Sequence, residues 1–122
     1  MHWADEVADA VVASGRRAVV STGISPSGDI HVGNLREVVT GDAIYRALVD
    51  RGMSAKLNFV CGNFDPLRRV YPFLDPVIYE PLVGKPLSEI PCPCGRHRSY
   101  GDHFLAPLLE CLTTLRIALE FL

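Results

Sequence analysis

The sequence has few lysines, little net charge and no long apolar run. Only two of its 122 residues are lysine, and the formal net charge is -2, so no basic face that could grip nucleic acid is predicted. No apolar run reaches the length of a transmembrane helix. The first six residues lack the basic and then apolar pattern of a signal peptide. We therefore expect a cytoplasmic protein.

What the sequence does contain is typical of a globular protein. Hydrophobic residues make up 48% and charged residues 21%, which excludes disorder of the whole chain. The length suits one compact domain or part of a larger one. The four cysteines are expected to be free thiols or metal ligands, because disulfides are rare in cytosolic proteins; they are Cys61, Cys92, Cys94 and Cys111.

The first half of the chain predicts a strand, helix and strand in series. Apolar residues recur at helical spacing over residues 2–14 and again over 33–50. A run of consecutive apolar and β-branched residues at 17–24 predicts a strand covered on both faces, as in a parallel sheet, and residues 56–61 predict a second strand. The strand at 17–24, the helix at 33–50 and the strand at 56–61 together form a βαβ unit. We expect an α/β fold of Rossmann type, with residues 1–64 as its nucleotide-binding unit.

The second half predicts less regular structure. Prolines divide residues 65–100, so we expect a loop region there, followed by a helix over 101–119. Pro107 is expected to kink that helix or to mark its first turn. The apolar residues 118–122 resemble the start of a third strand. Because natural termini are usually polar and loose, this ending leads us to expect a truncated domain.

Residues 26–34 read Pro-Ser-Gly-Asp-Ile-His-Val-Gly-Asn and connect the first strand to the second helix. Ligands of open α/β sheets bind at this position, and a helix N-terminus attracts phosphate. His31 could hydrogen-bond a phosphate, and Gly33 would let a nucleotide pass close to the backbone. The alternative is a plain strand–helix turn in which His31 and Asn34 only cap the helix.

A second group of residues has the chemistry of a metal site. Two thiols and two imidazoles within a short stretch fit tetrahedral zinc; they belong to Cys92, Cys94, His97 and His103. Against this, Arg96 and Arg98 would repel a cation, and a Cys-x-Cys pair is tighter than the usual spacing. The alternative is a proline-rich loop with free thiols and exposed histidines. The residues alone leave both interpretations open.

The motif and its surroundings resemble a known enzyme family. His-Val-Gly-Asn at 31–34 resembles the His-Ile-Gly-His signature of class I aminoacyl-tRNA synthetases, and the class I lysyl-tRNA synthetases of archaea and some bacteria look most similar. Further resembling blocks follow in family order at 2–5, 23–28, 31–37, 64–70, 84–91 and around 97–104. The resemblance implies the first half of a class I catalytic fold, and a lysine–tRNA ligase that uses ATP, Mg²⁺, lysine and tRNA(Lys).

The resemblance also implies residue roles. Catalysis would involve His31 and Asn34. The ATP site would be lined by Pro26, Ser27, Gly28, His31, Gly33 and Asn34. The lysine pocket would include Gly23, Ser25 and Asp65. In the alternative interpretation, Gly23 is a glycine that eases a strand end and Ser25 is a capping hydroxyl.

Two departures from the family pattern stand out. The family has two acidic residues before its aromatic-Asp pair, where this sequence has Gly62 and Asn63. The family's zinc segment resembles Asp-Pro-x-Gly-Cys-His, with a later His. Here Cys92 stands at the Asp position and Arg96 at the Cys position, so Cys94 is the candidate replacement thiolate.

These departures bear on activity. The second class I signature, a Lys-Met-Ser-Lys-Ser-like loop, is absent from these residues. We expect the 122-residue chain to be inactive alone and to need the C-terminal part of the enzyme as a partner. Two other interpretations remain: a fragment of another class I nucleotidyltransferase, such as a glutamyl- or cysteinyl-tRNA synthetase, and a non-catalytic remnant that binds nucleotide or zinc.

Overall fold

The computed structural model describes residues 1–122. Its helices and strands, in chain order, are α1 (Trp3–Ser14), β1 (Ala18–Ile24), α2 (Val32–Asp50), β2 (Ala55–Cys61), α3 (Pro76–Tyr79), the 3₁₀ turns η1 (Glu80–Leu82) and η2 (Leu87–Glu89), α4 (Tyr100–Thr114) and β3 (Glu120–Phe121). They divide into two compact units. Unit 1 comprises residues 1–23, 31–60 and 115–122, and unit 2 comprises 24–30 and 61–114.

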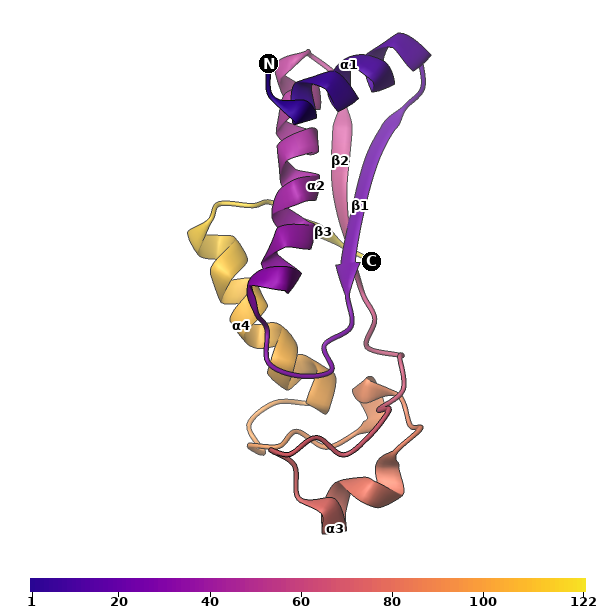
Figure 1. Ribbon diagram of the computed structural model, residues 1–122, viewed down its shortest axis with the longest axis vertical. Coiled ribbons are helices and arrows are strands. Elements are labelled where there is room, and N and C mark those ends of the chain that lie inside the picture. Colours follow the sequence, from indigo (N-terminus) through magenta and orange to yellow (C-terminus); the bar gives the residue numbers. More distant parts are fainter. The chain divides into compact units, whose positions relative to one another are not determined.

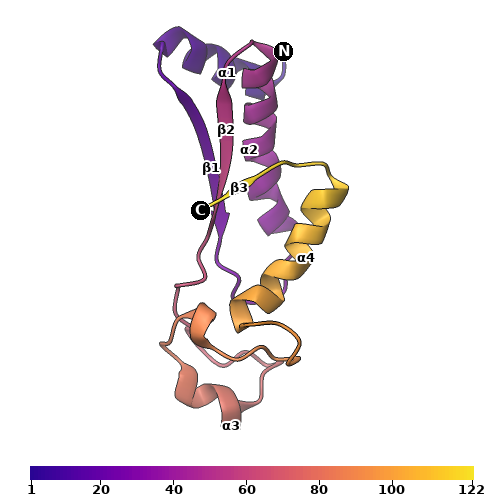
Figure 2. The same cartoon turned by 180° about the vertical axis from the view of Figure 1, so that it is seen from behind.

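Unit 1 is built on a three-stranded sheet in the order β1-β2-β3. β2 and β3 are parallel, with Asn58 opposite Glu120 and Phe59 opposite Phe121. β1 and β2 run side by side in the same direction, and α2 lies along one face of these strands (Figures 1 and 2). The predicted α/β fold with a parallel βαβ unit is confirmed, as is the third strand.

α1 begins and ends on clear local signals and packs against α2. The ring of His2 accepts a hydrogen bond from the Ala4 amide, and the Asp5 carboxylate accepts one from the His2 amide, which forms a capping box. Gly15 ends the helix with φ 67°, a conformation that glycine adopts without steric cost. Ala4 and Ala8 are buried, and such small side chains let two helices approach closely.

The strands are less covered than the sequence predicts. β1 was expected to be buried on both faces, but it lies at the edge of the sheet and Val19 is 56% exposed. Val39, an apolar residue of α2, is also exposed. An apolar run identifies a strand, but it does not say whether a neighbouring strand or helix covers it.

Unit 2 has its own core, formed mainly by side chains of the proline-rich segment. Its buried side chains are Leu67, Leu74, Tyr79, Leu87, Ile90, Tyr100 and Phe104. Residues 65–100 contain only short helical turns, as the prolines predict. Phe73 and Ile78, two apolar residues of this segment, are each about half exposed, at 52% and 51%.

α4 is shorter than predicted. It ends at Thr114 rather than at 119. The hydroxyls of Thr113 and Thr114 each donate to the carbonyl four residues earlier, and Arg116 adopts φ 55°. Side-chain bonds of this kind weaken a helix, and the left-handed residue stops it. Pro107 lies inside the helix and not in its first turn.

No helix of the chain has both the length and the apolar character needed to cross a membrane.

Candidate functional site

His31 forms the N-terminal cap of α2. Its Nδ1 accepts a hydrogen bond from the Gly33 amide at 3.0 Å, and its own amide donates to Asn34 Oδ1 at 3.0 Å. The capping role considered in the sequence analysis is therefore present. Because Nδ1 uses its lone pair in this bond, the neutral ring carries its proton on Nε2. His31 is exposed, so this Nε2–H is a free donor at a helix N-terminus, where anions bind.

The structure gives a reason for the glycine at position 33 that the sequence did not reveal. A Cβ atom placed on this residue would lie 2.8 Å from His31 Cε1 and 2.9 Å from its Nδ1. Real Cβ atoms do not approach so closely. Gly33 therefore makes room for the capping ring itself, in addition to any space it leaves for a ligand.

The loop at Pro26, Ser27 and Gly28 is held within unit 2. The Tyr100 hydroxyl donates to the Ser27 carbonyl at 2.6 Å, and Pro26 is fully buried. Burial raises the pKa of Tyr100, so its phenol stays protonated and remains a donor. The loop is therefore rigidly placed on the core of this unit.

Ser25 and Asp65 meet although forty positions separate them. The Ser25 hydroxyl donates to an Asp65 carboxylate oxygen in a very short hydrogen bond. Both line a hollow of about 200 Å³ within unit 2, together with Ser27, Pro66, Arg68, Tyr71 and Leu87. Arg68 and Tyr71 were not among the predicted site residues. Arg68 lies in the resembling block at 64–70, but no motif assigns a role to either residue, because the hollow is assembled from separate segments.

Gly62 makes the Ser25–Asp65 contact possible. A Cβ on Gly62 would lie 2.6 Å from Asp65 Oδ2 and 2.9 Å from Ser25 Oγ. This is one of the two positions at which the family pattern has an acidic residue. A side chain at this position would therefore displace the Ser25–Asp65 contact.

Gly23, predicted to contact lysine, lies in unit 1. A Cβ on Gly23 would lie 2.5 Å from the Val60 carbonyl oxygen of the neighbouring strand. The close approach of two backbones explains this glycine without a ligand. It does not line the hollow that contains Ser25 and Asp65.

The four predicted metal ligands converge on one point. Their ligand atoms all lie within 4.8 Å of one another. Cys92 Sγ lies 3.4 Å from Cys94 Sγ and 3.4 Å from His97 Nδ1. It also lies 3.3 Å from Nδ1 of His103 on α4, and Cys94 Sγ lies 3.5 Å from His97 Nδ1.

These distances fit tetrahedral zinc. Bonds of about 2.3 Å to sulfur and about 2.0 Å to nitrogen place two tetrahedral thiolates about 3.8 Å apart, and a thiolate and an imidazole about 3.5 Å apart. The four separations given above are within a few tenths of an ångström of these values, and all ligand atoms lie within 4.8 Å of one another. Two thiolates and two neutral imidazoles also form a common donor set of structural zinc sites.

The charges around the cluster are mixed. Burial opposes ionisation of Cys92, but hydrogen bonds from the His97 backbone and side chain, and from Cys94, lower its pKa to about 5. Cys92 is therefore a thiolate at neutral pH, the form that binds metals. Arg98, expected to repel a cation, forms an ion pair with Asp102 at 3.0 Å, which reduces that repulsion.

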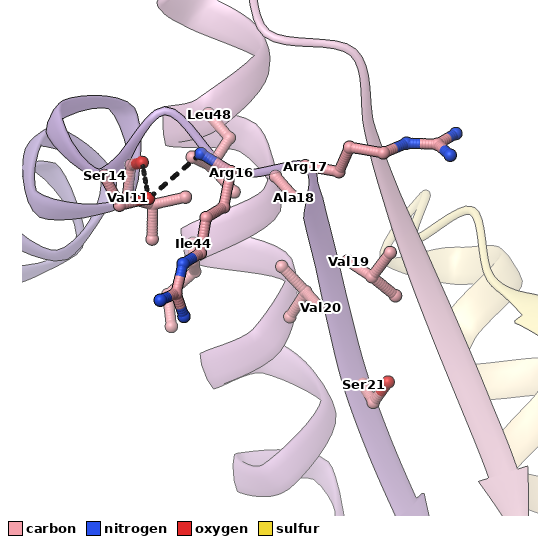
Figure 3. A pocket seen from close by; sticks show the side chains of 10 residues that line it. All are labelled: Val11, Ser14, Arg16, Arg17, Ala18, Val19, Val20, Ser21, Ile44 and Leu48. Carbon is pink, nitrogen blue, oxygen red and sulfur yellow. Dashed lines mark hydrogen bonds between the residues drawn. The ribbon is translucent and has the colours of Figure 1, made fainter.

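A further depression lies in unit 1, and none of these residues lines it. Its volume is about 440 Å³, and it is lined by Val11, Ser14, Arg16, Arg17, Ala18, Val19, Val20, Ser21, Ile44 and Leu48 (Figure 3). The Ser14 hydroxyl donates to the Val11 carbonyl and accepts from the Arg16 amide, so this hydroxyl has both a donor and an acceptor partner (Figure 3). It contains no residue with a predicted role.

Comparison with known proteins gives one consistent result. A family model described as tRNA synthetases class I (K) matches residues 1–122. A lysine–tRNA ligase of Methanosarcina barkeri is 56% identical over 117 residues, which are 96% of this chain and 22% of that protein. Lysine–tRNA ligase 1 of Methanosarcina acetivorans is 55% identical over 122 residues, which are 100% of this chain and 23% of that protein.

A third relative extends the result beyond one genus. The lysine–tRNA ligase of Archaeoglobus fulgidus is 55% identical over 120 residues, which are 98% of this chain and 24% of that protein. The chain thus spans less than a quarter of the length of each of these relatives. With the family model matching from the first residue to the last, this chain belongs to the class I (K) family of tRNA synthetases.

Proposed function

We propose that this chain is a catalytic part of a lysine–tRNA ligase, which activates lysine with ATP and transfers it to tRNA(Lys). The observation that carries the proposal is the 55% identity over all 122 residues to a lysine–tRNA ligase. In this reaction the lysine carboxylate attacks the α-phosphorus of ATP. Lysyl-adenylate forms and pyrophosphate leaves, and the acyl group then passes to the tRNA 3′ end.

The N-terminus of α2 is proposed to bind phosphate. The exposed Nε2–H of His31 is free to donate while Nδ1 holds the cap. The Asn34 side chain is engaged through Oδ1, so its amide nitrogen remains available as a donor. Mg²⁺, when bound with ATP, would neutralise phosphate charge. The assignment of Pro26, Ser27 and Gly28 to ATP binding is a separate proposal, because these residues lie in unit 2.

The hollow at Ser25 and Asp65 is proposed to bind lysine. It offers one carboxylate, from Asp65, and one guanidinium, from Arg68. An amino acid carries an ammonium and a carboxylate, so the two groups have complementary partners in this hollow. Tyr71 and Leu87 add apolar surface that suits an alkyl chain.

The Cys/His cluster is proposed to hold a structural zinc ion through Cys92, Cys94, His97 and His103. With four protein ligands, no position is left open for a substrate, so the metal would fasten the proline-rich loop to α4. Metal analysis of the chain purified without an affinity tag should find about one zinc per chain. The double variant Cys92→Ser with Cys94→Ser should contain none.

The catalytic proposal is best tested in a chimera. These 122 residues replace the matching residues of the Methanosarcina acetivorans enzyme, and lysine-dependent ATP–pyrophosphate exchange is measured. We expect exchange that depends on lysine and falls roughly 100- to 1000-fold in the His31→Ala chimera, because one preorganised phosphate contact is lost. His2→Ala, which alters only the cap of α1, is the matched control and should retain exchange.

The main alternative is a non-catalytic binding segment, and the glycine at position 62 favours it. A folded chimera that binds zinc and ATP but shows no exchange would support this alternative. The chimera with Gly62→Asp and Asn63→Asp would then show whether the missing carboxylates are the cause. Exchange with glutamate or cysteine in place of lysine would instead favour another class I enzyme.

A further inference from the structure

Cys92 and Cys94 form a pair of neighbouring thiols at the surface of unit 2. Their sulfur atoms lie 3.4 Å apart, with only Pro93 between them in sequence. Cys94 is exposed and Cys92 is half-buried, so a small oxidant reaches both. The other two cysteines, Cys61 and Cys111, lie outside this cluster.

We propose that Cys92 and Cys94 are a modification site, oxidised reversibly by a hydroperoxide to a disulfide with release of the bound metal ion. One thiolate sulfur attacks a peroxide oxygen, the O–O bond breaks, and water leaves after taking up a proton. The resulting sulfenic acid is attacked by the second sulfur, which forms the S–S bond and expels the hydroxyl group as a second water. In the metal-free chain, two thiols lose two electrons and two protons, and hydrogen peroxide becomes two molecules of water. In the loaded chain, two metal-bound thiolates lose two electrons, the two protons come from solvent and the ion leaves. A dithiol reductant returns two electrons and two protons to restore the thiols.

The local geometry permits this bond. A disulfide needs its sulfur atoms at about 2.05 Å, so the two atoms must move together by little more than an ångström. The backbone next to the pair already turns: the Gly95 amide donates to the Cys92 carbonyl at 3.2 Å, and Gly95 has φ 74°. No distant segment has to move to bring the two sulfurs together.

Oxidation would dismantle the cluster. Both thiolates would leave the ligand set, and only His97 and His103 would remain, which is too few for a tetrahedral site. Cys92 would also lose its 3.3 Å contact with His103 on α4. The loop from Pro91 onward would then be held to the helix by fewer groups.

This chemistry belongs to this chain rather than to the family pattern. That pattern has an aspartate at the position of Cys92 and a cysteine at that of Arg96, and so only one thiol. The disulfide part of the proposal rests on the two sulfurs alone. Only the release of metal rests on the zinc site proposed above.

The test treats the purified chain with hydrogen peroxide, once metal-free and once loaded with zinc. Peptide mass mapping should find a disulfide between Cys92 and Cys94 in both samples, reversed by dithiothreitol. A colorimetric chelator should detect one zinc released per disulfide formed. Cys94→Ser should abolish the disulfide, and the matched controls Cys61→Ser and Cys111→Ser should leave it unchanged.

The outcomes separate the two proposals. If the metal-free sample forms the disulfide but the chain never binds zinc, the redox proposal stands and the zinc site is rejected. Irreversible oxidation of Cys94 alone, or a disulfide between other cysteines, would overturn the redox pair even if zinc binds. Full zinc retention after the disulfide has formed would show that the pair is not part of the metal site.

Discussion

Among single residues, Gly33 and His31 are coupled, because the absence of a side chain at Gly33 lets the His31 ring occupy its capping position. The capping bond holds the imidazole against the α2 N-terminus and fixes which nitrogen carries the proton. The space for that ring exists only because residue 33 has no side chain. The proposed phosphate binding and the observed helix capping therefore involve the same two positions.

Gly33→Ala should displace the His31 ring from its cap. The new methyl group would lie 2.8 Å from the ring, so the Nδ1 bond to the backbone is lost. Loss of an N-cap costs about 0.5–2 kcal/mol of unfolding free energy, which urea denaturation should detect. Nitrogen NMR of the imidazole should show that the single Nε2–H tautomer is lost.

Gly28→Ala is the matched control for this substitution. A methyl group at Gly28 would meet only Phe73 Cζ, at 3.9 Å, an ordinary contact. The tautomer signal of His31 and the unfolding free energy should both stay as in the unmodified chain. An unchanged His31 signal in Gly33→Ala would contradict the capping geometry described above.

At the scale of secondary structure elements, the proline inside α4 costs stability that the chain could recover. Pro107 is exposed and offers no amide to the His103 carbonyl. Pro107→Ala should therefore raise the unfolding free energy by about 1–3 kcal/mol, reduced slightly by the freer unfolded chain. Chemical denaturation measures the change. Glu110→Ala, on the exposed side of the same helix, should change it by less than about 0.5 kcal/mol.

Arg51 joins the two helices of unit 1. From the C-cap of α2 it donates to Asp9 at 2.5 Å and to Asp5 at 3.1 Å, both on α1. Arg51→Met should lower the Tm, and Arg51→Lys should lower it less, because a lysine keeps the charge but not the paired donors.

The same contact has a predicted pH dependence. The hydrogen bond from Arg51 lowers the pKa of Asp9 below its ordinary value. The ion pair therefore stabilises the fold above an ordinary aspartate pKa of about 4, and this contribution is lost as the pH falls through the lowered value. The Tm difference between the unmodified chain and Arg51→Met should shrink over that acidic range. A difference that grows on acidification would contradict this assignment.

Local signals in the sequence were enough to predict most elements. The capping residue His31, the glycine after α1 and the prolines of residues 65–100 each act over a few neighbours, so their effects can be predicted without a structure. Exposure of Val19 and the early end of α4 could not be predicted, because they depend on which strand lies alongside and on competing side-chain bonds.

The same distinction holds for the candidate site. The metal ligands are close in sequence, and their convergence agrees with the prediction from their chemistry. The hollow around Ser25 needs Asp65 from forty positions away, and no motif predicted that Arg68 and Tyr71 would line it. The separation of Gly23 from that hollow likewise depends on strand packing.

For the whole molecule, metal removal should affect the two units differently. All four candidate ligands belong to unit 2, and none belongs to unit 1. Treatment with a strong chelator should therefore speed amide hydrogen exchange at Ile90, Tyr100 and Phe104. Amides of Val38 and Leu57 in unit 1 should exchange at an unchanged rate.

Two further results complete this experiment. Adding back one equivalent of zinc should restore slow exchange in unit 2, and the double serine variant at Cys92 and Cys94 should exchange fast with or without chelator. Equal acceleration in both units would mean that the metal stabilises the chain in some other way. No acceleration anywhere would remove the structural role proposed for zinc.

The short span of the metal ligands has a consequence for the order in which the chain folds. All four lie between positions 92 and 103, so closing the ligand loop costs little entropy. The Ser25–Asp65 contact must close a loop of forty positions. A nascent chain could therefore capture zinc as soon as His103 leaves the ribosome, and the captured ion would align the start of α4. Oxidation of the two thiols before that point would leave the nascent chain without this early step.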